Sequence, residues 1–135
     1  MAEKRNSLFV VDDDSSVRAA LKRLLEALGF NVKTFKSAEE FLDSGLAQCP
    51  DLLILDVRMT GMTGLELQRT LIEQGSDIPV IFVTAYDDMN ARRVAMEAGA
   101  VAFVQKPFDE EILVDAIQRG LGRQPQRVPS QVNSE

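Results

Sequence analysis

The sequence predicts an α/β protein with a doubly wound sheet of five parallel strands, each followed by a helix, a (βα)5 arrangement. Short apolar runs recur along the chain, and segments with apolar residues at helical spacing separate them. Alternation of this kind requires parallel strands with right-handed crossovers and helices on both faces of the sheet. The expected strand order is 2-1-3-4-5, the flavodoxin-like order, with the first and third strands side by side.

The first strand and helix are predicted near the N-terminus. Ser7–Val11 is a short β-rich apolar run, and the residues after it repeat apolar side chains at steps of three and four. Asp14 or Ser15 can cap the start of this helix, and Gly29 suits the position just past its end. Asn31–Phe35 alternates and carries β-branched residues, which favours a second strand at the edge of the sheet.

The next two helices flank the most apolar strand of the first half. Ser37–Glu40 has the Ser-x-x-Glu pattern of a capping box, and Phe41 and Leu42 supply the apolar side of a short helix. Leu52–Leu55 is a continuous apolar run of the kind that is buried on both faces of a sheet. After two glycines, a third helix is indicated by its apolar residues Leu65, Leu67, Leu71 and Ile72.

The second half of the chain repeats the same alternation. Val80–Val83 is a buried strand that ends in Thr84, and a helix is expected from about Asp88 to Ala98. Ala102–Gln105 is the last short strand. The final helix runs from about Asp109 to Leu121, with acidic residues near its start. Its predicted apolar stripe consists of Ile112, Leu113, Ala116, Ile117 and Leu121.

The length and composition indicate one soluble globular domain. The chain has 135 residues, of which 45% are hydrophobic and 27% charged. We expect the folded domain to span residues 1–122, and residues 123–135, which lack apolar periodicity, to form a flexible tail or the start of an interdomain linker. The formal net charge of -6 argues against this segment binding nucleic acid by itself.

Several other classes of protein are disfavoured. No apolar run approaches the roughly 18 residues that a membrane span needs, and the N-terminus lacks a signal-peptide core. The single cysteine, Cys49, cannot form an internal disulfide, which favours the cytoplasm. The chain contains no histidine, and this excludes zinc sites and catalytic triads that depend on histidine.

The polar residues that carry chemistry gather where the predicted strands end. Asp12 and Asp13 follow the first strand, Asp56 follows the third, Thr84 ends the fourth and Lys106 follows the fifth. In open α/β sheets, ligands bind at this edge. Carboxylates hold Mg²⁺ and can become aspartyl phosphates, while lysine and threonine offer a charge and a hydroxyl to phosphoryl oxygens. The set fits phosphoryl transfer to Asp56.

Each residue also has a simpler interpretation. Asp56 is able to cap a turn, and the acids at 12–14 are able to cap the first helix and favour its dipole. One acid is enough for a cap, however, and adjacent carboxylates repel one another unless a cation lies between them. Thr84 has an alternative as an ordinary strand residue, and Lys106 as a solvated lysine. Convergence of all five positions favours the functional interpretation.

At these positions the sequence resembles the receiver domain of bacterial two-component response regulators. The resemblance covers about residues 7–121 and rests on Val-Val-Asp12-Asp13, on Leu-Asp56 followed by Arg-Met-x-Gly-Met-x-Gly-Leu-Glu-Leu, on Val-Thr84-Ala85 and on Lys106-Pro107-Phe108. The strings Val-Arg-Met, Ser-Ala-Glu-Glu-Phe-Leu and Ala-Gly-Ala-Val-x-Phe-Val-x-Lys-Pro-Phe are similar to those of FixJ-type receivers.

The resemblance implies a role for each residue of the site. Asp56 would accept phosphate from a phosphohistidine on a sensor histidine kinase. Asp13, Asp56 and the backbone carbonyl of Arg58 would bind Mg²⁺, with Mn²⁺ as an alternative, and Asp12 would act through water. Thr84 and Lys106 would contact the phosphoryl group. Phe103 takes the place of the family's switch aromatic, and the bond between Lys106 and Pro107 is expected to be cis.

The resemblance also implies what the domain controls. Phosphorylation would bias a face made of the fourth helix, fifth strand and fifth helix, and so control an output, in this case transcription. The mixed charges of that face suit a phosphorylation-dependent homodimer, with a merely solvated surface as the alternative; they are Arg92, Arg93, Glu97, Asp109, Asp115 and Arg119.

DNA would be contacted only through a helix-turn-helix output domain, which is absent from this chain. A stand-alone receiver remains the other possibility. No membrane partner is expected, and the domain would be a cytoplasmic phospho-accepting signalling module that assists only its own phosphorylation and dephosphorylation, not an enzyme.

Two positions depart from the family pattern. Thr60 stands where proline is common after the Arg-Met pair, and we expect this to loosen the loop that carries the Arg58 carbonyl and to weaken metal binding. Tyr86 lies beside the expected path of an attacking water. We hypothesise that Arg58 and Tyr86 shield the aspartyl phosphate and slow its hydrolysis.

Two other functions compete with phosphoryl acceptance. Asp12-x-Asp14-x-Ser16 imitates the nucleophile motif of haloacid-dehalogenase-type phosphatases. That class needs a further acidic pair and usually a cap domain, and it would leave Asp56 without a role. A receiver fold used only as a binding scaffold is the other alternative, and it predicts the loss of acidic residues or of the lysine, all of which are present.

Overall fold

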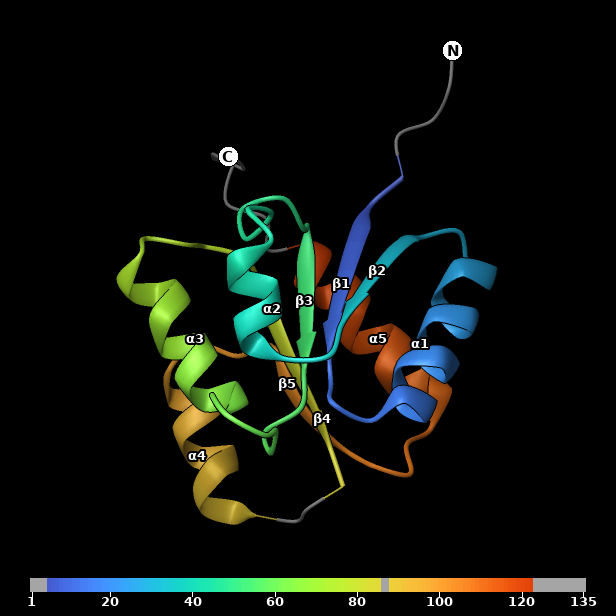
Figure 1. The fold of residues 1–135 in the computed structure, drawn as a ribbon. Helices are drawn as coiled ribbons and strands as arrows, with labels where there is room; N and C mark the ends of the chain where they lie inside the picture. Colours follow the sequence, from blue (N-terminus) through green and yellow to red (C-terminus); the bar gives the residue numbers. More distant parts are fainter. Residues whose placement is uncertain (1–4, 86–87, 123–135) are drawn as a thin grey trace, which may run out of the picture.

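The computed structural model describes residues 5–85 and 88–122, and strands and helices alternate through them (Figure 1). Each helix follows the strand of the same number. The strands are β1 (Ser7–Val11), β2 (Asn31–Phe35), β3 (Leu52–Leu55), β4 (Val80–Thr84) and β5 (Ala102–Gln105). The helices are α1 (Ser15–Ala27), α2 (Ala38–Asp43), α3 (Gly64–Glu73), α4 (Met89–Glu97) and α5 (Glu110–Leu121).

The sheet confirms the predicted fold class and strand order. Its five strands run in the order β2-β1-β3-β4-β5, and all neighbouring pairs are parallel. In the register between β1 and β3, Val11 lies opposite Leu55, so the residues that follow these strands emerge side by side. The strands of such a sheet end at a common edge, which we call the carboxyl edge.

Helices cover both faces of the sheet, as parallel strands require (Figure 1). Alternate residues of each buried strand point to opposite faces, so two cores form. Leu8, Val10 and Ile54 pack with α1 and α5, while Phe9, Leu53 and Leu55 pack with α2, α3 and α4. Within the second core, the rings of Phe9, Phe35 and Phe41 contact one another in tilted and edge-on arrangements.

Helix caps explain where most helices begin. Asp14 caps α1 by accepting hydrogen bonds from the backbone of Ser16 and Val17. At α2, the Ser37 hydroxyl accepts from Glu40 N, but the Glu40 carboxylate accepts from Lys36 N. The predicted capping box is therefore only half formed. A complete capping box, which was not predicted, stands at the start of α3, where Thr63 and Glu66 bond reciprocally.

Two isoleucines placed in apolar stripes are exposed instead. Ile112 is 57% exposed and Ile72 is 49% exposed. The buried stripe of α5 begins at Leu113 and continues through Ala116, Ile117 and Gly120, so Ile112 lies about 100° off it around the helix. Sequence spacing predicted the helix correctly, but contact with the sheet selected a narrower face.

Two further expectations concern the C-terminal tail and membrane-spanning helices. The predicted tail or linker at residues 123–135 lies outside the described residues. Within residues 5–85 and 88–122, none of the helices combines the length and apolar character that crossing a membrane requires.

Candidate functional site

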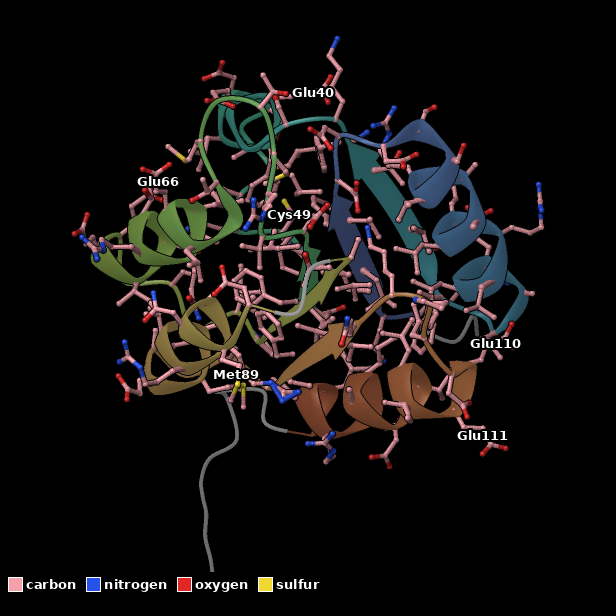
Figure 2. The ribbon with its side chains drawn as sticks, turned by 90° about the horizontal axis from the view of Figure 1, so that it is seen from below. Glu40, Cys49, Glu66, Met89, Glu110 and Glu111 are labelled. Carbon is pink, nitrogen blue, oxygen red and sulfur yellow. The ribbon has the colours of Figure 1, made fainter. Side chains whose placement is uncertain are left out.

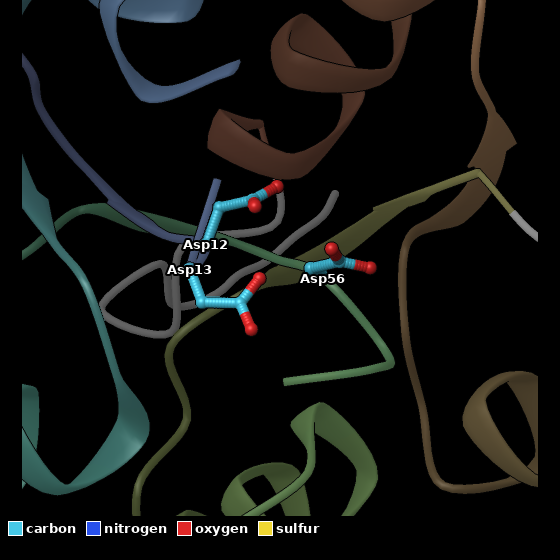
Figure 3. Close-up of side chains that lie close together, drawn as sticks. All are labelled: Asp12, Asp13 and Asp56. Carbon is cyan, nitrogen blue, oxygen red and sulfur yellow. The ribbon is translucent and has the colours of Figure 1, made fainter. Parts of the chain in front are cut away.

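Asp12 and Asp56 lie beside each other at the carboxyl edge because β1 and β3 are paired (Figure 3). The backbone N–H of Asp56 donates to the carbonyl of Val11 at 3.1 Å, which continues the ladder one step past the strands. Asp12 is 2% exposed and Asp56 is 8% exposed. Two carboxylates are thus held close together with little access to water.

Asp13 completes a cluster of three acids with Asp12 and Asp56 (Figure 3). One carboxylate oxygen from each residue lies within 4.8 Å of the other two. Asp13 is the exposed member and the other two are buried. An all-oxygen set with an open side fits Mg²⁺, which keeps several waters when it binds protein carboxylates.

Burial raises the pKa of Asp12, because desolvation disfavours the charged form, and the nearby charge of Asp56 acts in the same direction. A hydrogen bond from the backbone N–H of Asp14 to Oδ1, at 2.9 Å, and the proximity of Lys106 lower the pKa in part. The negative charge of Asp12 is therefore still disfavoured, and a cation bound beside it would stabilise that charge.

Lys106 reaches the cluster from the end of β5. Its ammonium lies 3.0 Å from Oδ2 of Asp12 and 3.6 Å from Oδ2 of Asp56, with 16% of its side chain exposed. The Lys106–Pro107 bond is cis, as the resemblance implied. The backbone N–H of Lys106 donates to the carbonyl of Thr84 at 2.7 Å, and Thr84 itself is fully buried at the end of β4.

The loop between β3 and α3 is held close against Asp56. A Cβ added to Gly64 would lie 2.1 Å from the carbonyl oxygen of Asp56, so only glycine fits at this approach. Gly64 N donates to the carbonyl of Val57 at 2.9 Å, and Arg58 N approaches Oδ1 of Asp56 at 3.4 Å. Gly64 was noted in the sequence only as a loop marker, although its position eight residues after Asp56 belongs to the matching motif.

The same loop is attached to two other segments. Thr60 donates from its backbone N–H to Oδ2 of Asp13 at 3.1 Å, and its hydroxyl lies 3.4 Å from the same oxygen. Met62 N donates to Oε2 of Glu39, on α2, at 2.8 Å. These bonds attach the loop at two points, and the loosening expected from the missing proline stays a prediction. Backbone contacts of this kind leave no residue pattern that a single sequence displays.

Comparison with known proteins identifies the family of this chain. The family model of the response regulator receiver domain matches residues 8–118. The chain belongs to the response regulator receiver domain family. Acceptance of a phosphoryl group is the function of this family.

Curated relatives include response regulator protein TmoT of Ectopseudomonas mendocina, which is 44% identical over 94% of this chain and 58% of its own length. Transcriptional regulatory protein TdiR of Thauera aromatica is 41% identical over 86% of this chain and 51% of its length. This chain therefore spans little more than half of these relatives.

Solved structures agree with the fold. The response regulator StyR superposes with a TM-score of 0.83 and 44% identity, covering 91% of this chain and 62% of that one. The receiver domain FixJ-N gives a TM-score of 0.81 and 37% identity, covering 89% of this chain and 96% of that one. The resemblance to FixJ-type receivers is thereby confirmed.

In this receiver domain, Phe103 lies half-buried on β5 between two partners. Its ring centroid is 6.0 Å from that of Phe82, and the guanidinium carbon of Arg92 lies 5.5 Å from the Phe103 ring. Arg92 also donates to the Phe103 carbonyl at 3.1 Å. The ring thus joins β4 to α4, beside the face that the resemblance assigned to switching.

Several charges of that face already pair within the receiver domain. Arg93 bonds Glu97 at 3.3 Å and Arg119 bonds Asp115 at 3.2 Å, each one turn apart on its own helix. Figure 2 looks at the molecule from the side toward which the strands point, and Met89 marks the exposed start of α4 there.

The geometry weakens the phosphatase alternative. Asp14, the second acid of the imitated motif, is engaged in capping α1 through Oδ1. The cluster is completed by Asp56, for which that alternative has no role. The guanidinium of Arg58 lies 3.9 Å from Oδ2 of Asp88. Tyr86 lies outside the described residues, and the shielding role of Arg58 and Tyr86 stays a prediction.

Proposed function

We propose that Asp56 is the residue that accepts a phosphoryl group, delivered by a phosphohistidine of a sensor histidine kinase. The observation that carries this proposal is the convergence of Asp12, Asp13 and Asp56 within 4.8 Å, beside the ammonium of Lys106. Asp56 follows β3, the middle strand of the sheet. The domain acts as a signalling module that assists its own phosphorylation, without a separate substrate to turn over.

The transfer forms one bond and breaks another. A carboxylate oxygen of Asp56 attacks phosphorus, the phosphorus–nitrogen bond of the phosphohistidine breaks, and the imidazole leaves with its nitrogen lone pair and takes up a proton. The product is an aspartyl phosphate, a mixed anhydride that water can later hydrolyse. Catalysis of such a step depends on positioning and on charge stabilisation.

Asp13, Asp56 and the backbone carbonyl of Arg58 are the residues we assign to Mg²⁺ or Mn²⁺, with Asp12 acting through water. The all-oxygen donor set and the raised pKa of Asp12 support this assignment. The cation would supply positive charge that draws negative charge off the incoming phosphoryl group.

Lys106 and Thr84 are assigned to the phosphoryl oxygens. Lys106 is already poised beside Asp56, and a modest shift of its flexible side chain brings the ammonium to a phosphoryl oxygen. Thr84 ends the neighbouring strand β4 and offers a hydroxyl donor.

We further propose that Thr84 and Phe103 carry the signal to the face formed by α4, β5 and α5. Movement of Thr84 toward the phosphate would free space beside β4, and Phe103, packed on Phe82, lies next to it. The altered face would support a phosphorylation-dependent homodimer. Because Arg93 and Arg119 have partners on their own helices, those ion pairs would have to exchange.

The proposed output is transcription. This chain matches only 51% of the length of a transcriptional regulatory protein and 58% of the length of a response regulator, which supports contact with DNA through an additional output domain. We also propose that the domain works in the cytoplasm, where response regulators generally act.

Intact mass after incubation with acetyl phosphate tests the acceptor. We expect one phosphoryl adduct that depends on Mg²⁺ and is lost in Asp56→Asn. Asp115→Asn, an exposed carboxyl on α5, is the matched control and should retain the adduct. No adduct in the wild type with excess donor would favour the scaffold alternative. An adduct that survives Asp56→Asn and disappears in Asp12→Asn would favour the phosphatase-like alternative.

A further inference from the structure

The hydrogen bonds between Thr60 and Asp13 join two loops of the site that are 47 positions apart in sequence. Both donors of Thr60 approach the same oxygen of Asp13, the backbone N–H at 3.1 Å and the hydroxyl at 3.4 Å. The other carboxylate oxygen of Asp13 takes neither bond. Asp13 can therefore keep its contact with Thr60 and still offer an oxygen to a cation.

Asp13 needs such an anchor more than the other two acids. Asp12 and Asp56 are buried and are held by neighbours, whereas Asp13 is exposed at the open side of the cluster. A carboxylate without a fixed neighbour samples several rotamers, and a ligand that binds it must offset the lost side-chain freedom. A donor that holds Asp13 in place reduces this cost.

The contact also fixes a second proposed ligand. Thr60 lies two residues after Arg58, whose carbonyl we assign to the metal, so the bond to Asp13 sets the position of this carbonyl relative to the carboxylate. Glu39 holds the next part of the loop through Met62 N at 2.8 Å. The loop is consequently attached on both sides of Gly61, which has a φ of 82°.

We propose that Thr60 is a positioning residue that preorganises the Asp13 carboxylate and the Arg58 carbonyl for a divalent cation. The inference rests on the metal site proposed above. It reverses the expectation that the missing proline weakens metal binding. Proline has no N–H to donate, so the backbone bond to Asp13 is available only because another residue stands at this position.

Three substitutions separate the two donors of Thr60. Thr60→Val removes the hydroxyl and keeps the N–H, Thr60→Ala does the same with less bulk, and Thr60→Pro removes both donors. Isothermal titration calorimetry of the whole chain with MgCl₂ measures the dissociation constant directly, without phosphorylation. Thr70→Val is the matched control, since the Thr70 hydroxyl bonds only the Glu66 carbonyl within α3 among the described contacts.

We expect Thr60→Pro to raise the Mg²⁺ dissociation constant by roughly threefold to tenfold, the range of a charge-assisted hydrogen bond that remains open to water. Val and Ala should change it by less than about threefold, and Thr70→Val should not change it. A dissociation constant for folded Thr60→Pro within twofold of wild type would overturn the inference and leave the proposed function intact. No Mg²⁺ binding by the wild type would overturn both.

Hydrogen exchange of the wild-type chain provides a test that needs no variant. The Thr60 amide should be protected without metal and gain further protection with Mg²⁺, since coupling between the bond and the cation is reciprocal. The Thr63 amide bonds the Glu66 carboxylate at 2.9 Å and is the control, which should gain less. An unprotected Thr60 amide without metal would show that the anchor does not form, and would overturn the inference.

Discussion

The ammonium of Lys106 lies 3.0 Å from Oδ2 of Asp12, a contact between residues 94 positions apart that closes the carboxyl edge over the acidic cluster. The same ammonium is 3.6 Å from Oδ2 of Asp56. Lys106 therefore partly neutralises the two buried carboxylates before any cation or phosphoryl group arrives.

Lys106→Met should tighten Mg²⁺ binding while slowing phosphorylation. Methionine has about the length of the apolar lysine stem but lacks the ammonium charge. That charge would compete with a metal ion for Asp12 and Asp56, so the Mg²⁺ dissociation constant should fall roughly threefold to tenfold. The rate of phosphorylation by acetyl phosphate should fall about tenfold or more, since the proposed donor to the phosphoryl oxygens is lost.

Calorimetry with MgCl₂ and time-resolved intact mass measure these two quantities for Lys106→Met. Lys22→Met, which removes an exposed lysine on α1 that pairs with Glu26, is the control and should change neither. Weaker Mg²⁺ binding by Lys106→Met would contradict the competition between the ammonium and the cation.

Asp12 should give the metal-free domain a distinctive pH dependence. The pKa of Asp12 in the folded state is raised above its ordinary value of 3.8, which we take for the unfolded state. At a pH between the ordinary and the raised pKa, the folded state therefore binds more protons than the unfolded state. The contribution of Asp12 to stability is therefore fully present below 3.8 and is lost as the pH rises through the raised pKa.

Urea unfolding of wild type and Asp12→Asn, in buffer with a chelator, measures this contribution. We expect the stability of Asp12→Asn relative to wild type to increase as the pH rises from about 4 to about 7. Asp77→Asn, in an exposed loop position, controls for any general effect of removing a carboxyl. A difference that shrinks as the pH rises would contradict the prediction.

Gly64→Ala should destabilise the domain by displacing the backbone at Asp56. The new Cβ would lie 2.1 Å from the Asp56 carbonyl oxygen, and backbone must move to make room. Overpacking of this kind costs about 1–3 kcal/mol of unfolding free energy. Gly122→Ala, whose Cβ would have its nearest contact at 3.5 Å, should stay within about 0.5 kcal/mol. Urea unfolding measures the free energy of unfolding of both variants. An equal loss of stability in Gly64→Ala and Gly122→Ala would contradict the close approach at Gly64.

Phe103→Leu should separate phosphoryl acceptance from the response of the switching face. The substitution keeps an apolar side chain beside Phe82 but removes the ring that Arg92 covers. We expect the phosphoryl adduct to form within about threefold of the wild-type rate, because the Phe103 ring packs against Phe82 and Arg92 rather than in the acidic cluster. We expect the phosphorylation-dependent change over α4 to be lost.

Hydrogen exchange over residues 89–97, with and without acetyl phosphate, measures this response. Ile112→Ala is the control, because Ile112 is 57% exposed on α5 near the same face and its substitution leaves the Phe103 ring in place. A wild-type response in Phe103→Leu would contradict the role of the ring.

The fold, the strand order and the identity of the clustered acids were predictable from sequence for a physical reason. Buried parallel strands must be continuously apolar, as at Leu52–Leu55, and helices between them must repeat apolar residues every three or four positions. Once parallel strands are inferred, their ends share an edge, so Asp12, Asp56 and Lys106 are expected to meet without any knowledge of distances.

Other features depended on three-dimensional contact. The sequence alone placed Ile112 in the buried stripe of α5, but the sheet selected the face that begins at Leu113. It suggested a capping box at Ser37, whereas Glu40 bonds Lys36 instead. Such outcomes differ by a small rotation of a helix or by one backbone position, which periodic patterns do not resolve.

Sequence by itself thus determined the architecture and the residue types of the site, because buried strands and helices require apolar residues at regular spacing along the chain. Only the tertiary structure decided how the loops of the site are held. Thr60 bonds Asp13, Glu39 bonds Met62, and the approach of Gly64 to the Asp56 carbonyl leaves no room for a Cβ. These contacts join backbone groups and side chains from distant segments, and no local pattern records which donor will find which acceptor.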